Sequence, residues 1–217
     1  LEAARPYAAE ALTCDEGELV FVDGIFSASG TNRSITIEDL VLRLVPDIGD
    51  HPFNIKHSYE PDGSTYPYGC HIAEIEIDPA TCDVNIMRYT VVDDFGAVIN
   101  PLMLEGQIHG GIAQGIGQAI HEYAAFDEQG QLVAGSLMDY RLPRAADLPT
   151  FDIHFRSIPC KNNILGVKGS GEAGAIGAPQ TVIAAVTDAL GIAHIDMPAT
   201  PAAIWQALQN KQSGKVA

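Results

Sequence analysis

Basic side chains are scarce in this sequence. Its 217 residues include 12 Lys and Arg against 28 Asp and Glu, which gives a formal net charge of -16. Such an excess of negative charge repels the phosphates of nucleic acids and anionic lipid surfaces at long range. Nucleic acid is therefore not an expected partner. The 47% of hydrophobic residues supplies enough core-forming material for a soluble globular protein.

Cysteines and long apolar runs are also few. The cysteines, at positions 14, 70, 82 and 160, form no C-x-x-C pair and have no histidine at zinc-ligand spacing. No metal site built from protein side chains is therefore predicted, and we expect reduced thiols in a cytoplasmic protein. No apolar run is long enough to cross a bilayer, and no signal-peptide pattern opens the chain, so no membrane partner is expected.

Short strands and separate helices alternate along the chain. We predict helices over 1–12, 36–44, 101–123, 179–190 and 201–210, hairpins over 18–29, 71–94 and 124–136, and a strand within 151–158. This order is typical of an α+β fold, with β-hairpins and a mixed sheet packed with several helices, rather than of regular βαβ winding. A stretch rich in Pro, Gly and Asp, residues 46–69, predicts a connecting loop. We therefore divide the chain into an N-terminal segment, 1–64, and a C-terminal segment, 65–217.

The predicted helix over 101–123 carries an unusual number of glycines, at positions 106, 110, 111, 115 and 117. Each costs about 1 kcal/mol relative to Ala in a helix interior, so a bare strip of backbone must offer a compensating contact. That contact is either close packing of another element or a flat polar ligand. Three glutamines on the same helix favour the ligand, and Gln114, beside Gly115, has the least shielded amide.

A second glycine cluster, residues 169–174, reads GSGEAG and matches G-x-G-x-x-G, with Asp196 placed like the ribose-binding acid of a dinucleotide fold. Two observations argue against that interpretation. Pro179 is predicted to delay the following helix, and too little chain follows to build the remaining strands. The flanking glycines instead allow Glu172 to stand against a bound ligand as a general base. A plain surface turn with a solvated Glu172 is the alternative.

The two clusters taken together resemble a known family. "GQIHGGIAQGIGQAIHE", followed after about fifty residues by "LGVKGSGEAGAIGAP" and an apolar helix containing "AVTDAL", is similar to the molybdenum hydroxylases. These include xanthine dehydrogenase, aldehyde oxidase and carbon monoxide dehydrogenase. The hairpin "TYPYGCHIAEIEIDPATCDVNIMRYTVVDDFGAVINP" looks like the one that precedes the first motif in that family's large subunit.

The resemblance implies a molybdenum pyranopterin, either molybdopterin or its cytosine dinucleotide, which supports hydroxylation of an electron-poor carbon with water-derived oxygen. It places the family's catalytic base at Glu172. It assigns cofactor contacts to Gln114 and Gly115 and to the loop formed by Lys168, Gly169, Ser170 and Gly171. The cofactor's own dithiolene holds the metal, so no metal-ligating side chain is expected from this chain.

The resemblance also implies partners, and the sequence departs from the family at one turn. We expect the remainder of a longer molybdopterin-binding subunit, iron-sulfur and FAD modules, a small-molecule substrate and an oligomeric assembly. The chain, which opens at Leu1 in helical pattern, is expected to be inactive by itself. A non-catalytic scaffold of the same complex is the alternative. Cys82 stands at a turn where the family usually has Gly, which predicts a strained left-handed backbone there.

Overall fold

The computed structural model describes residues 1–44, 53–61 and 63–214. The chain divides into two compact units, Leu1–Glu60 and Pro61–Ala217, which are described separately below. The predicted connecting loop over 46–69 lies partly outside the described residues. Within the described ranges, no helix combines the length and the apolar character that crossing a membrane requires.

The first unit is a small antiparallel sheet packed by two helices. Its strands are β1 (Leu19–Val22), β2 (Ile25–Ala28) and β3 (Ser34–Thr36), and its α-helices are α1 (Arg5–Leu12) and α2 (Ile37–Leu44). The predicted hairpin is confirmed. Asp23 and Gly24 both have positive φ, at 48° and 81°, as a two-residue turn of this hand requires. Phe26, Leu40 and Ala8 are fully buried at its centre.

The second unit is built on a mixed sheet of three strands, β4 (Tyr68–Ile77), β5 (Val84–Asp94) and β6 (Phe151–Phe155). The first two form the predicted long hairpin, and β6 pairs with β5 in parallel. The tight turn of the hairpin contains Cys82 at φ 60°, which confirms the left-handed conformation expected there. The α+β prediction is therefore confirmed.

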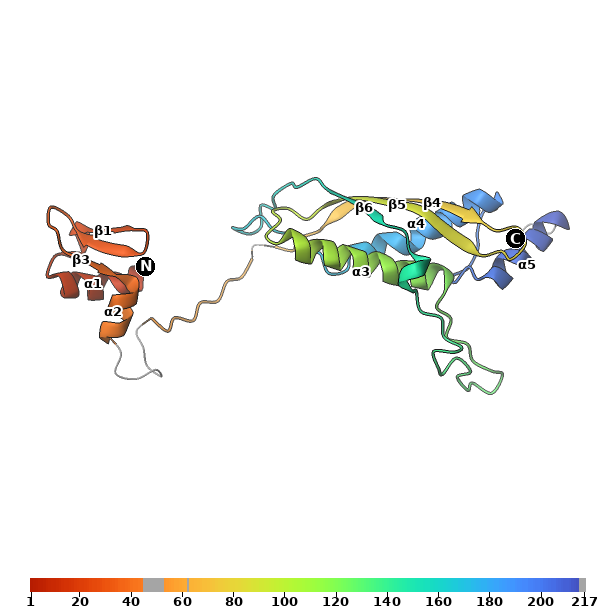
Figure 1. The fold of residues 1–217 in the computed structure, drawn as a ribbon, viewed down its shortest axis with the longest axis horizontal. Helices are drawn as coiled ribbons and strands as arrows, with labels where there is room; N and C mark the ends of the chain where they lie inside the picture. The colour runs from red at the N-terminus through yellow and green to blue at the C-terminus, as the bar shows by residue number, and fades with distance from the viewer. Residues whose placement is uncertain (45–52, 62, 215–217) are drawn as a thin grey trace. The chain divides into compact units, whose positions relative to one another are not determined.

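Three helices complete this unit: α3 (Pro101–Ile120), α4 (Ala173–Leu190) and α5 (Pro201–Gln212). In Figure 1, α3 and α4 run side by side along one face of the sheet. The start of α3 is set locally, because the Asn100 side chain accepts a hydrogen bond from the backbone N–H of Met103 at 3.1 Å.

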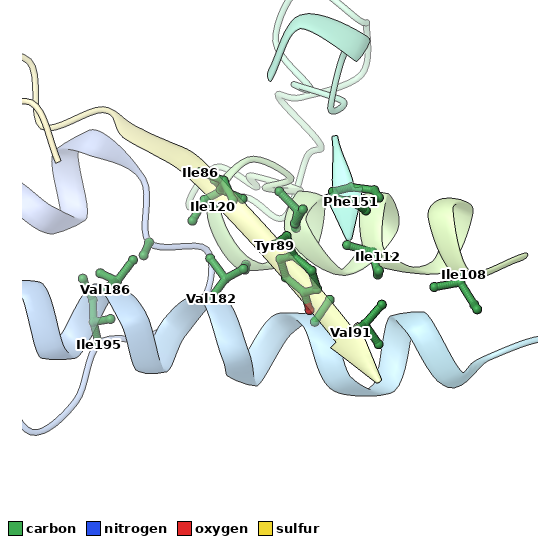
Figure 2. Packing of buried hydrophobic residues seen from close by; sticks show 14 of the residues in the cluster. Ile86, Tyr89, Val91, Ile108, Ile112, Ile120, Phe151, Val182, Val186 and Ile195 are labelled. Carbon is green, nitrogen blue, oxygen red and sulfur yellow. The ribbon is translucent and has the colours of Figure 1, made fainter. Parts of the chain in front are cut away.

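Isoleucines at positions 108, 112 and 116 recur at helical spacing and form one buried stripe of α3. Figure 2 shows Ile108 and Ile112 of this stripe on the side of α3 that faces β5 and α4. Tyr89 and Val91 of β5 and Val182 of α4 belong to the same buried cluster. Each buried aliphatic side chain contributes about 1.5–3 kcal/mol by leaving water. This core holds α3, α4 and the sheet in a fixed relation, which the candidate site requires.

The start of α4 corrects the sequence prediction. The helix begins at Ala173, immediately after the glycine cluster, and Pro179 lies inside it. Proline in a helix interior removes one hydrogen bond and crowds the preceding turn, at a cost of about 3 kcal/mol. Contact with α3 offsets that cost, because the Pro179 ring packs against the bare backbone of Gly115.

Two smaller predictions also differ from the structure. α3 ends at Ile120 rather than at Tyr123, and the backbone N–H of Glu122 turns back to the carbonyl of Gly117 at 2.8 Å. The hairpin expected over 124–136 forms one antiparallel bridge, between Phe126 and Leu132, without extended strands.

Candidate functional site

Four of the five glycines of α3 form two pairs with different surroundings. A Cβ added at Gly111 would lie 2.9 Å from Cα of Gly174, and one added at Gly115 would lie 2.6 Å from Cβ of Ala178. A Cβ at Gly106 or Gly110 would meet nothing within 4 Å. Close helix packing therefore accounts for the first pair, whereas the second pair leaves an open strip of backbone.

The close contacts also fix the direction of α4. Because Gly111 meets Gly174 and Gly115 meets Ala178, the two helices run the same way. The first turn of α4 consequently meets α3 between Gln107 and Gln114. The start of α4, where Glu172 lies, is thereby brought to the glutamine-bearing part of α3.

Gln114 is exposed, and Gly115 beside it is buried. Both line a pocket of about 420 Å³, together with Gln118, Glu122, Ala124, Tyr140 and Ala175. Ala175 comes from the first turn of α4, and Pro179 cannot donate the helical hydrogen bond to its carbonyl. The pocket therefore joins the two helices and presents several polar groups to whatever fills it.

Glu172 is the N-cap residue of α4. Its side chain makes no capping hydrogen bond, and the residue is exposed. Ala175, about one turn further along α4, lines the pocket at Gln114, but Glu172 itself does not. A carboxylate in this position is available for proton transfer, because no backbone N–H of the helix start occupies it.

The loop that precedes Glu172 offers unused donors. Among the described residues, no hydrogen bond occupies the backbone N–H groups of Ser170, Gly171 and Glu172. A Cβ at Gly169 or Gly171 would meet nothing within 4 Å. N–H groups at the start of a helix are suited to anionic or strongly polar oxygen atoms.

Lys168 is placed differently from its loop neighbours. Its ammonium lies 2.5 Å from Oδ2 of Asp94 and 4.4 Å from the centre of the Tyr68 ring. The two paired side chains are only 8% and 4% exposed. Hydrogen bonding to Asp94 raises the pKa of Lys168 and outweighs the opposing effect of burial.

A second pocket, of about 250 Å³, lies at the start of α3. Lys168 and Ser170 line it from the loop, and Asn100, Met103 and Gln107 line it from the start of α3. The predicted residues are thus divided: Gln114 and Gly115 line one pocket, and Lys168 and Ser170 line another. The first turn of α4, which follows Glu172, contacts α3 between Gln107 of the one pocket and Gln114 of the other.

Two residues that line the pocket at Gln114, Glu122 and Tyr140, were not predicted from the sequence. Tyr140 donates its hydroxyl proton to Oε2 of Glu122 at 2.5 Å, and this bond raises the pKa of Tyr140. The two residues are far apart in sequence, and no motif links them. The buried Asp94 was also missed, although adjacent acids at the end of an apolar strand, Asp93 and Asp94, could have drawn attention to it.

The structure revises one argument about the G-x-G-x-x-G match. The cluster does lead directly into α4, so the expected delay of the helix is wrong. The cluster and α4 nevertheless do not form a βαβ unit, because β6 precedes them and no strand follows α4 among the described residues. Within the same ranges, no group of three or more His, Cys, Asp or Glu side chains is arranged to hold a metal ion.

Two known proteins are similar to nearly the whole chain. The carbon monoxide dehydrogenase large chain of Hydrogenophaga pseudoflava is 35% identical over 95% of this chain and 26% of its own length. The nicotine 6-hydroxylase large subunit of Paenarthrobacter nicotinovorans is 34% identical over 92% of this chain and 26% of its own. The chain therefore spans about a quarter of the length of these relatives.

Solved structures of two enzymes are similar to this chain in fold. The Cu,Mo-CO dehydrogenase superposes with a TM-score of 0.80 at 29% identity, over 100% of this chain and 28% of that one. Quinoline 2-oxidoreductase from Pseudomonas putida 86 gives 0.79 at 32% identity, over 96% and 28%. The family described as "Molybdopterin cofactor-binding domain" matches residues 1–149, which include Gln114 and Gly115. The chain therefore belongs to the molybdopterin cofactor-binding domain family.

Proposed function

We propose that this chain forms one wall of the molybdenum pyranopterin site of a hydroxylase or dehydrogenase, with Glu172 as the general base. The observation that carries the proposal is the contact between Gly111 and Gly174, which brings the start of α4 onto the glutamine-bearing part of α3. Family membership supports the cofactor class. The two clusters that suggested this function in the sequence are thus in direct contact.

The residues present fit such a group. Its oxygen-rich periphery needs hydrogen-bond donors, and the free N–H groups of Ser170, Gly171 and Glu172 supply them. The open space at Gly169 and Gly171 admits a close approach to the backbone. When bound, the cofactor would supply a water-derived oxygen and accept the electrons of the oxidised substrate.

Each side chain then has a defined part. The Glu172 carboxylate takes the proton that is released as oxygen is transferred to an electron-poor carbon. The Gln114 amide hydrogen-bonds and orients the cofactor from α3, while Gly115 keeps α4 close enough for both helices to contribute. The backbone of Lys168, Gly169, Ser170 and Gly171 completes the wall.

The remaining partners belong to the same proposal. The two relatives described above are named a large chain and a large subunit, and each is about four times as long as this chain. We propose that the rest of such a subunit closes the site, that iron-sulfur and FAD modules carry the electrons onward, and that the assembly is oligomeric. The chain by itself is then inactive, and an electron-poor small molecule is the substrate.

The test is Glu172→Gln in the assembled enzyme. A general base typically contributes about 10² to 10⁴ in rate, so turnover falls by at least about a hundredfold. Molybdenum content, measured by elemental analysis, stays at the wild-type level because the amide keeps the shape of the loop. Glu105→Gln, an exposed glutamate on α3, is the matched control. Wild-type turnover in Glu172→Gln refutes the assignment of the base.

A further inference from the structure

Asp94 connects three segments that meet beneath the glycine loop. Its Oδ1 accepts hydrogen bonds from the N–H groups of Gly96 at 2.8 Å and Ile158 at 2.9 Å. Its Oδ2 receives the ammonium of Lys168. One buried carboxylate thus joins the end of β5, the chain that follows β6, and the loop that leads to Glu172.

Further backbone and side-chain hydrogen bonds hold the chain up to Lys168. The backbone N–H of Lys168 donates to the carbonyl of Phe95 at 2.9 Å, and Val167 forms an antiparallel bridge with Gly96. The Asn163 side chain brackets Val167, with hydrogen bonds of 2.9 and 3.1 Å. Beyond Lys168, the hydrogen bond of Gly169 to the Thr65 hydroxyl is long, at 3.4 Å.

The ammonium of Lys168 is therefore held by contacts within the protein. A side chain that is 8% exposed, paired with Asp94 and covered by the Tyr68 ring, cannot reach a ligand without breaking a buried ion pair. Leaving either partner unpaired in that site is strongly unfavourable. The lysine that the motif presents as a cofactor contact thus contributes through its backbone and its anchoring.

We propose that Asp94 and Lys168 are a pair of positioning residues that fix the last anchored point of the loop, so that Gly169 to Glu172 project in one arrangement toward the cofactor. This inference rests on the proposed function for the identity of the ligand. The anchoring itself can be measured independently of catalysis. Neither side chain is assigned a contact with substrate or cofactor.

The test uses Lys168→Met and Asp94→Asn in the complete subunit, produced without cofactor in a host that cannot make molybdopterin. The backbone N–H groups of Val167 and Lys168 are hydrogen-bonded in the anchor. Their hydrogen exchange should become at least about tenfold faster in both variants, because the anchor opens locally more often. The matched controls are Lys161→Met, an exposed lysine of the same loop, and Asp152→Asn, whose carboxylate pairs with Arg88 on the sheet. Both controls keep wild-type exchange at Val167 and Lys168.

The variants are then compared in the loaded enzyme. Lower molybdenum content and a lower kcat with KM nearly unchanged are expected for Lys168→Met, and Lys168→Arg should recover part of each by restoring a cation at Asp94. Wild-type exchange at Val167 and Lys168 in Lys168→Met overturns the proposal. So does uniformly faster exchange throughout the unit, which marks a general loss of stability. These outcomes are separable from failure of the base assignment, because Glu172→Gln leaves the anchor intact.

The pH dependence offers a further check in the same variants. Burial favours the protonated form of Asp94, yet hydrogen bonds from Lys168, from the backbone N–H groups of Ile158 and Gly96, and from Tyr68 together lower the pKa of Asp94 well below its ordinary value. A carboxylate with a lowered pKa stabilises the fold above its unfolded pKa of about 3.9, and this stabilisation is lost as pH falls toward the folded value. The difference in Tm between wild type and Asp94→Asn should be full at neutral pH and narrow below about pH 4. A difference that stays constant down to acid pH contradicts a role for the Asp94 charge.

Discussion

Two pairs of glycines, one from each cluster, have opposite surroundings in the structure. On α3, Gly111 and Gly115 are buried because atoms of α4 occupy the space that a side chain would need. In the loop before α4, Gly169 and Gly171 are exposed, and a Cβ at either would meet nothing. The first pair brings two helices together, whereas the second leaves room for something outside the chain. A glycine pattern thus identifies a close approach without showing whether the approaching group is protein or ligand.

The largest effect should come from filling the space between the helices. Gly115→Leu inserts a side chain where even a Cβ would lie 2.8 Å from Cδ of Pro179. Overpacking of a core typically costs about 1–3 kcal/mol, and the rigid proline ring leaves little room for relief. We expect a loss of at least about 3 kcal/mol in the free energy of unfolding, measured by denaturant titration. A variant as stable as wild type would show that α3 and α4 are not in this contact.

The comparison also explains which parts of the structure were predictable. Helix starts at Thr36, Asn100 and Thr200 are encoded within three residues, because each side chain accepts a hydrogen bond from a backbone N–H one turn ahead. The Asp23-Gly24 turn is local in the same sense. These helix starts and this turn can be predicted from the sequence, because they do not depend on distant residues.

Features that depend on distant contacts were predicted poorly. Pro179 usually signals a helix start, but here its cost is offset by a contact with Gly115 of another helix. The Lys168–Asp94 pair joins residues 74 positions apart, with no periodicity to link them. For the same reason, neither glycine motif predicts the hydrogen bond between Tyr140 and Glu122 at the Gln114 pocket.

An intermediate effect is expected in the open loop. Gly171→Ala adds one methyl group to free space at a residue whose φ is not in the left-handed region, so Tm should change little. If the cofactor lies against this backbone, the methyl group displaces it, and turnover should fall by about tenfold, the effect of a small misplacement of reacting groups. Turnover and molybdenum content are measured in the assembled enzyme, with Gly135→Ala, an exposed glycine with equally open surroundings, as the control. Unchanged values for Gly171→Ala would place the cofactor elsewhere.

The smallest effect should come from the exposed glycines of α3 itself. Gly110 lies beside the buried Gly111, yet a Cβ there would meet nothing within 4 Å. Since Ala is favoured over Gly in a helix by up to about 1 kcal/mol, Gly110→Ala should raise the free energy of unfolding by about 0.5–1 kcal/mol, and Gly106→Ala should do the same. Gly111→Ala, one residue away, should lower it, because its Cβ would meet the backbone of Gly174. Opposite signs at neighbouring positions would separate the packed strip from the open one. A loss of molybdenum in Gly110→Ala, despite the added stability, would show that the open strip also contacts the cofactor.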